Sequence, residues 1–360
     1  MTMTVSIPEP VTASPADTRV EFLKRSGRGY TVVRHIFRQL PDTCPNRVSV
    51  LGPMVTERKR RSVQLYLLLL TAWPWLEREE EPLQALVWAR ALTTGTGRIW
   101  KPSQVSAVWT DLESRGLISR RRLSRGLVVE PRREDGQEPY TSPGGKKNDR
   151  FESYFTMPAE FWTDEWFETL TLPGLAMLLI IAGETSDQDH REVWLTNEHA
   201  GGWYGISPRS VEAGIRDLAT HGLVDERTEW TKAPLSPVGA TKRHWYSLTG
   251  AFSTEARLAE QARAQDEVVR RKRTDAVASQ ALGEPRAPKR TRRRQPAQRD
   301  DAERAVKPHD DRPHLCRRNQ GQWLRDRGRD PAGGRSRRAP QTRPGPRPAA
   351  PAEPPHEGRE

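Results

Sequence analysis

The sequence predicts a mainly α-helical protein with small β-hairpins, in which two similar units follow one another and a basic tail ends the chain. Residues 104–121 and 210–227 lie 106 positions apart and share seven of 18 aligned residues, which indicates a duplicated structural unit. Residues 63–72 and 172–182 are apolar runs suited to buried helices. Beyond residue 281, Arg, Pro, Gly and Ala dominate and leave few apolar side chains to bury.

These features set the predicted boundaries. Each unit repeats one pattern, so we expect each to fold around its own hydrophobic core. The expected order is a partly disordered N-terminal extension over 1–57, a first unit over 58–133, a linker over 134–150, a second unit over 151–253, a helix over 254–280 and a disordered Arg/Pro-rich tail over 281–360. The helix over 254–280 is predicted from its Ala, Glu, Arg and Gln content, either as a dimerisation arm or as a solvated helix.

The first unit is predicted to contain three helices and a hairpin. Its third helix has apolar residues at helical spacing, and the residues after it are basic. The expected elements are a helix over 63–72, a helix over 83–92, a turn over 95–97, a helix that opens at Pro102, and a hairpin with its tip at 120–126 and its returning strand at 127–129.

The second unit repeats this order with one additional strand. We expect a helix over 172–182, a strand over 193–195, a short helix over 196–200, a turn over 201–205, a helix that opens at Pro208, and a returning strand over 244–248.

The third helix of each unit carries the clearest start and stop patterns. Ser207 is a good N-cap, and Pro208 at the first helical position loses only an amide that would have no helical partner. Gly116 and Gly222 can adopt the left-handed conformation that ends a helix. Leu-Ile or Leu-Val then follows, which indicates the start of a strand.

This pattern of Pro, an apolar face, a leucine and then Gly-Leu-Ile/Val resembles the recognition helix and first wing strand of winged helix-turn-helix proteins. The resemblance covers residues 58–133 and 151–250. It implies two winged-helix domains in tandem, which would bind double-stranded DNA with the third helix in the major groove. Tandem winged helices in one chain also look like plasmid replication initiators, whose two domains read successive parts of a repeated site.

The residues expected to contact DNA lie on the polar faces of the two third helices and on the first hairpin. A glutamine can pair with adenine, and Lys or Arg can reach guanine or phosphate. The candidates are Lys101, Ser103, Gln104, Ser106 and Thr110 in the first helix, Arg120, Arg121, Arg122 and Arg125 in the hairpin, and Ser207, Arg209, Ser210 and Arg216 in the second helix. For the residues of the second helix, the sequence favours DNA contact no more than an ordinary solvated surface, because Glu212 would repel phosphate.

Charge is distributed unevenly along the chain. Residues 1–150 contain 25 basic and 16 acidic residues, whereas residues 151–200 contain one basic and ten acidic residues. The acidic segment 151–200 is therefore a candidate surface for a protein partner. The basic tail could bind phosphate nonspecifically or be a solvated charge block.

Other function classes find little support in the sequence. No Walker loop is present, because the Thr94–Arg98 segment lacks the lysine and the spacing. No cysteine pairs stand at zinc-ligand spacing, and Asp187, Asp189, His190 and Glu192 are better explained as an exposed turn than as a metal site. No enzymatic activity, metal or cofactor is expected. Two cysteines and an N-terminus without signal-peptide character predict a cytoplasmic protein with no membrane span.

The function expected first is regulation of transcription by DNA binding, as a monomer or as a homodimer. The alternative is replication initiation on a plasmid or phage-like element. A third reading is a winged-helix adaptor that binds protein through the acidic segment. A palindromic dimer footprint would favour the regulator, and a monomer spanning two adjacent major grooves would favour the initiator.

Overall fold

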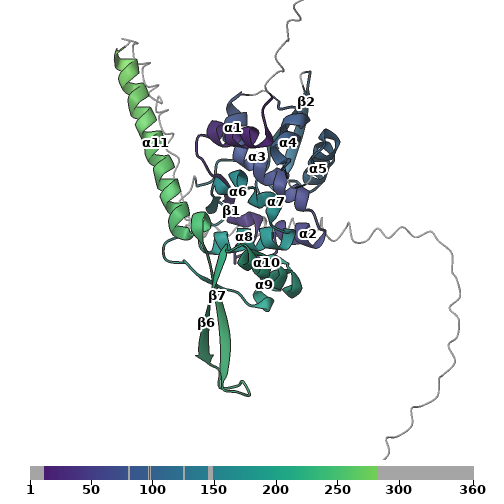
Figure 1. Ribbon diagram of the computed structural model, residues 1–360, viewed down its shortest axis with the longest axis vertical. Coiled ribbons are helices and arrows are strands. Elements are labelled where there is room, and N and C mark those ends of the chain that lie inside the picture. Colours follow the sequence, from purple (N-terminus) through teal and green to yellow (C-terminus); the bar gives the residue numbers. More distant parts are fainter. Residues whose placement is uncertain are drawn as a thin grey trace, which may run out of the picture. The chain divides into compact units, whose positions relative to one another are not determined.

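Two successions of elements follow the same order in the computed structural model, which describes residues 12–79, 82–95, 97, 99–124, 126–144 and 149–281 (Figure 1). In each, a short strand and short helices precede a long apolar helix, two further helices and a hairpin. The first consists of α1 (Pro15–Ser26), β1 (Thr31–Arg34), η1 (His35–Phe37), α2 (Leu51–Thr56), α3 (Arg60–Glu79), α4 (Ala85–Leu92), α5 (Pro102–Ser114), β2 (Ile118–Leu123) and β3 (Gly126–Pro131).

The second succession ends in a long helix. It consists of β4 (Tyr154–Met157), α6 (Glu160–Thr163), α7 (Trp166–Thr169), α8 (Leu172–Glu184), β5 (Val193–Trp194), α9 (Asn197–Tyr204), α10 (Pro208–Thr220), β6 (Val224–Lys232), β7 (Ala240–Leu248), η2 (Gly250–Phe252) and α11 (Thr254–Ala281). The predicted class of a mainly α protein with small antiparallel sheets is confirmed, as is a helix over 254–280. The turn predicted over 201–205 is wrong in part, because α9 continues to Tyr204 and only Gly205 leaves the helix, with φ 67°.

Three small antiparallel sheets are present among the described residues. β2 pairs with β3 in the first half, and β5, β7 and β6 form a three-stranded sheet in that order in the second. The third sheet joins the halves, because β1 pairs with β4 from Thr31 opposite Met157 to Arg34 opposite Tyr154.

Residues at equivalent positions of the repeat have equivalent roles. Leu112 and Leu218 are both fully buried. Gly116 and Gly222 both adopt left-handed conformations, with φ 73° and 66°, where the helix ends and the strand begins. The sequence repeat therefore corresponds to a structural repeat at the level of single residues.

The two halves contact each other through equivalent elements. Each strand of the β1–β4 pair packs on the long helix of its own half, α3 or α8. The Gln64 Nε2 of α3 donates to the Phe167 carbonyl of α7 over 2.6 Å. In the opposite direction, α2 contacts α8, and a Cβ at Gly52 would lie only 2.2 Å from the Tyr204 carbonyl oxygen of α9. Equivalent elements that exchange equivalent contacts are the arrangement that a local twofold axis produces.

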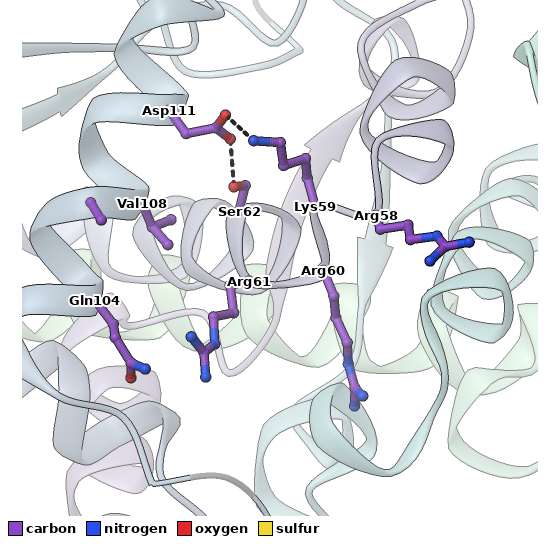
Figure 2. Close-up of a pocket in the computed structure, with 9 residues that line it drawn as sticks. Arg58, Lys59, Arg60, Arg61, Ser62, Gln104, Val108 and Asp111 are labelled. Atoms are coloured by element: carbon purple, nitrogen blue, oxygen red, sulfur yellow. Dashed lines mark hydrogen bonds and ion pairs between the residues drawn. The ribbon is translucent and has the colours of Figure 1, made fainter.

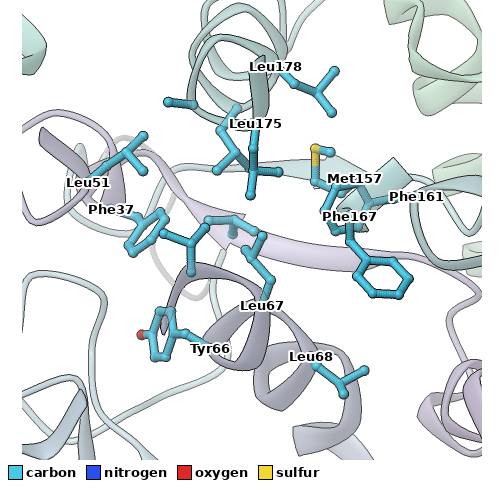
Figure 3. Packing of buried hydrophobic residues seen from close by; sticks show 14 of the residues in the cluster. Phe37, Leu51, Tyr66, Leu67, Leu68, Met157, Phe161, Phe167, Leu175 and Leu178 are labelled. Atoms are coloured by element: carbon cyan, nitrogen blue, oxygen red, sulfur yellow. The ribbon is translucent and has the colours of Figure 1, made fainter. Parts of the chain in front are cut away.

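The hydrophobic core is continuous across this junction. Figure 3 shows Tyr66 and Leu67 of α3 close to Leu175 of α8 and Met157 of β4, and all of them belong to one buried cluster. The described residues also belong to one compact unit. The expectation of separate cores is therefore wrong, because the apolar helices of both halves bury their surfaces partly against the shared strand pair.

The segment predicted as an N-terminal extension belongs to this core from residue 12 onward. Arg19 of α1 is buried and donates to the carbonyls of Ala91 and Thr93 over 3.1 and 3.0 Å, and it pairs with Glu165 at the start of α7. The predicted linker also begins inside the fold, since Glu134 is fully buried. Residues 1–11 and 282–360, including the tail that was predicted to be disordered, lie outside the described residues.

The first turn of α11 packs against the C-terminal end of α8. The buried Arg257 donates to the carbonyls of Ala182 and Thr185 over 2.8 and 2.6 Å. A cation at the C-terminal end of a helix is favoured both by these unpaired carbonyls and by the helix dipole. In the described part of the chain, no helix is both long enough and apolar enough to cross a membrane.

Close packing of α10 on α8 provides a test of the fold. A Cβ at Gly214 would lie 2.5 Å from the Pro173 carbonyl oxygen and 2.5 Å from the Met177 Cγ. Gly214→Ala should therefore lower the free energy of unfolding by about 1–3 kcal/mol, as overpacking does. The matched control is Gly202→Ala in α9, where a Cβ meets no atom within 4 Å and should stabilise the helix by roughly 0.5–1 kcal/mol. Urea denaturation measures both, and a stabilising Gly214→Ala would contradict this packing.

Candidate nucleic-acid interface

The outer face of α5 is polar and exposed, as the sequence predicted. Val105, Val108, Trp109 and Leu112 are buried on the inner face. Lys101, Ser103, Ser106 and Thr110 are exposed on the other side, whereas Gln104 is half-buried. The hydroxyls of Ser106 and Thr110 each donate to a backbone carbonyl one turn earlier, over 3.1 Å. Both oxygens remain able to accept a bond from outside the chain.

Gln104 has a structural role in addition to the base contact predicted for it. Its Oε1 accepts a hydrogen bond from the Lys101 backbone N–H at 3.0 Å, which satisfies one of the amides left over at the start of α5. A replacement that removes this oxygen would therefore affect the helix as well as any contact with a base.

A basic pocket of about 500 Å³ lies between α5 and the start of α3 (Figure 2). Four consecutive cations, Arg58 to Arg61, line it together with Ser62 and with Gln104, Ala107, Val108 and Asp111 of α5. Gln104 was among the predicted contacts, whereas the cations Arg58 to Arg61 were not. The run of four basic residues before an apolar helix was visible in the sequence, but it lies 43 positions from Gln104 at its nearest, so only the fold shows that they share a pocket.

The four cations differ in their partners. Lys59 pairs with Asp111 at 2.8 Å, Arg60 lies 3.5 Å from Glu168, and the guanidinium of Arg61 lies 5.3 Å from the centre of the Trp100 ring. Arg58 is exposed and forms no ion pair with the described residues. Its backbone is left-handed, with φ 59°, which is uncommon for a residue other than glycine. Positive charge is thus held at the N-terminal end of α3, where the helix dipole also favours an anion.

Asp111 connects α5 to this basic segment. It accepts hydrogen bonds from the Ser62 hydroxyl at 2.6 Å and from the Lys59 ammonium at 2.8 Å. The equivalent Asp217 accepts from the Thr171 backbone N–H and hydroxyl, at 2.8 and 2.7 Å, at the start of α8. In both halves one aspartate therefore fixes the third helix to the first residues of the long apolar helix.

The pKa of Asp111 makes this tie measurable. Burial raises the pKa of its carboxyl, but hydrogen bonds from Arg115, Lys59 and Ser62 outweigh burial and lower the pKa from 3.8 to about 2. A carboxyl whose pKa is lower in the folded state stabilises the fold above its unfolded pKa, and this contribution is lost as the pH falls through the folded value.

We therefore expect Asp111→Asn to be less stable than the parent by about 1–2 kcal/mol above pH 4, with the difference closing as the pH falls towards 2. Chemical denaturation across this pH range measures the difference, and the exposed Asp266→Asn serves as the matched control. A difference that is independent of pH would show that the charge of Asp111 does not stabilise the fold.

Some of the β2–β3 hairpin arginines that were predicted to contact DNA are exposed. Arg121 and Arg122 are exposed, and Arg121 lies 3.6 Å from Glu130. Arg120 instead pairs with Glu113 and donates to the Thr110 hydroxyl at 3.2 Å, so it is directed back onto α5. Arg125 lies outside the described residues.

The region of the second half equivalent to the basic pocket, around α10 and the start of α8, contains fewer cations. Ser207 accepts from the Ser210 backbone N–H at 3.2 Å and so caps α10, as predicted. Arg209 and Arg216 are exposed, but so is Glu212. No cation is present at the start of α8, where residues 168–173 are Glu-Thr-Leu-Thr-Leu-Pro.

Many of the acidic side chains of residues 151–200 form ion pairs within the chain. Four of its glutamates pair with arginines that precede residue 61, and a fifth pairs with an arginine of β6. The pairs are Glu152 with Arg34, Glu165 with Arg19, Glu168 with Arg60, Glu184 with Arg38, and Glu192 with Arg227. The charge difference between the halves thus serves their mutual packing and does not by itself indicate an external partner.

No group of three or more potential metal ligands occurs in the part of the chain that the structure describes. The Asp187–His190 segment is an exposed turn, in which Asp187 accepts from the backbone N–H groups of Asp189 and His190. The chain matches no protein-family model, no curated protein and no solved structure.

Proposed function

We propose that this protein binds double-stranded DNA through α5, the start of α3 and the β2–β3 hairpin, and that it regulates transcription. In this proposal the two successions of elements are tandem winged helices, with α5 and α10 as recognition helices. The observation that carries the proposal is the proximity of the exposed polar face of α5 to the basic pocket formed by residues 58–61. A helix that fits the major groove needs flanking cations for phosphate, and both lie on one surface here.

The roles follow from the geometry. Arg58, Arg121 and Arg122 are exposed and would contact phosphates on either side of the groove. Lys101 and Ser103 at the start of α5 and the amide nitrogen of Gln104 would face base edges. Ala107 lines the pocket and is small enough to allow close approach of the helix to DNA.

Two variants separate phosphate contact from base reading. A duplex selected from a random-sequence library serves as the probe, and a random duplex serves as its reference. Replacing Arg58, Arg121 and Arg122 together by Gln should weaken binding to both duplexes and reduce the slope of affinity against salt by about 3, at roughly 0.9 for each phosphate contact. The charge-matched control is Arg270→Gln with Arg271→Gln and Arg273→Gln on α11.

Gln104→Glu keeps the oxygen that caps α5 but removes the amide donor. It should reduce the preference for the selected duplex by about 1–3 kcal/mol without loss of thermal stability. An unchanged ratio of affinities for selected and random duplexes would show that Gln104 does not read a base, and an absence of any duplex binding would refute the proposed function.

The reciprocal contacts between the halves favour replication initiation as a second candidate. They hold both third helices in one body, so a single chain could engage two successive segments of one duplex. Footprinting together with native mass spectrometry distinguishes the two functions. One chain on an extended, non-palindromic site supports an initiator, whereas two chains on a palindrome support a regulator.

A further inference from the structure

The distal end of the β6–β7 hairpin differs from the rest of the described surface in its shape and in its exposed apolar side chains. Each strand has nine residues, and the loop between them, residues 233–239, contains two prolines. The loop is held by its own hydrogen bonds, from the Ala233 N–H to the Gly239 carbonyl at 2.9 Å and from the Ser236 hydroxyl to the Ala240 carbonyl at 3.0 Å. The hairpin tip is therefore a shaped loop on a long two-stranded ribbon (Figure 1).

Large apolar side chains are exposed at this tip. Leu235 is fully exposed, Val238 is 79 % exposed, and Trp230 is 68 % exposed. Of the eight large hydrophobic side chains exposed among the described residues, these three lie within nine positions of one hairpin. Isolated exposed apolar residues are ordinary, but such a cluster on a projecting loop marks an interaction surface.

The charges around the tip have one sign. Residues 230–243 contain Lys232, Lys242 and Arg243 and no acidic residue. Lys242 lies directly opposite Trp230 in the strand register, and Lys232 shares their face because it is two positions from Trp230. Neither lysine forms an ion pair with the described residues, and both are exposed.

Two acidic residues of β6 have partners within the hairpin. Glu226 pairs with His244, and Glu229 accepts from the Trp245 indole N–H at 2.8 Å. Glu229 is thus bonded within the ribbon and lies on the face opposite Trp230, while the tip combines apolar side chains with lysines that form no ion pair with the described residues.

We propose that this tip inserts into the minor groove of the DNA bound by the protein, where Leu235 and Val238 wedge between neighbouring base pairs and bend the duplex. Apolar wedges carried on β-ribbons unstack a base step, and flanking cations neutralise phosphates on either side. Lys232 and Lys242 are the cations placed for that role, and Trp230 on the same face packs against the sugars. The inference rests on the proposed DNA binding and adds deformation of the duplex to it.

The test uses the full chain and the selected duplex, labelled at its two ends for energy transfer and carrying 2-aminopurine within the site. The parent protein should shorten the end-to-end distance and raise the 2-aminopurine fluorescence. Leu235→Ser combined with Val238→Ser should abolish both changes while affinity falls less than tenfold and the melting temperature stays the same. Thr241→Ala, exposed on the other face of the ribbon, is the control and should bend DNA as the parent does.

Replacing Lys232 and Lys242 by Gln should reduce the salt slope by about 2. If the parent binds the duplex but does not bend it, or if the tip variant bends it equally, the wedge is refuted and the proposed DNA binding stands. If the parent binds no duplex, both proposals fail.

Binding to vesicles that contain phosphatidylserine is the last measurement, because an apolar tip with lysines also suits an anionic lipid surface. Tip-dependent binding to these vesicles without bending of DNA would assign the tip to a membrane and overturn the inference.

Discussion

Glu134→Gln should destabilise the protein by about 3–5 kcal/mol, which is the usual effect of removing one charge from a buried ion pair. Glu134 and Arg34 are both fully buried and lie 2.8 Å apart. Arg34 also donates to Glu152 at 2.9 Å and to the Thr141 carbonyl at 2.6 Å. This one guanidinium connects β1, the segment after β3 and the segment before β4. Removing the negative charge of Glu134 therefore destabilises the junction of the two halves.

Equilibrium unfolding in urea measures this effect, with the exposed Glu138→Gln as the control. Arg34→Met combined with Glu134→Leu and Glu152→Gln should recover much of the loss, because none of the three paired charges remains. A Glu134→Gln variant within 0.5 kcal/mol of the parent, an estimated limit for surface changes, would show that the pair contributes nothing specific.

Leu112→Ala and Leu218→Ala should each lower the free energy of unfolding by about 2–5 kcal/mol, because both side chains are fully buried. The continuous core adds a second expectation. Either change should lower the protection of amides in both halves together, since the strand pair β1–β4 and the packing of α7 on α3 connect them.

Native-state hydrogen exchange provides this readout, and Leu86→Ala at a site that is 57 % exposed is the control. Protection that is lost in one half while the other keeps its full value would show that the halves are independent, as the repeat alone had suggested.

Elements with strong local patterns could be predicted from the sequence. The third helices were found because proline, apolar spacing and a terminal glycine act over a few residues, and Ser207 is the cap that its position indicated. The helix of residues 254–281 was predicted from composition alone.

The junction could not be predicted, because it depends on pairing between residues 120 to 126 positions apart. Residues 12–57 contain buried arginines such as Arg19 and Arg34, which in a sequence indicate surface. The basic pocket was missed for a related reason. Arg58 to Arg61 resemble a solvated charge run, and only the packing of α5 beside α3 brings Gln104 and Ala107 to them.

The pairing of β1 with β4 has a consequence for synthesis on the ribosome. Val33 must wait for Phe155, 122 residues later, which takes roughly 6–24 s at about 5–20 residues per second. During that interval the first half has an unpaired strand edge and part of an apolar core without its cover. Such edges favour pairing with other chains. A nascent chain stalled or truncated before residue 154 should therefore be a chaperone client or an aggregate, even though it contains α5, the basic pocket and the β2–β3 hairpin.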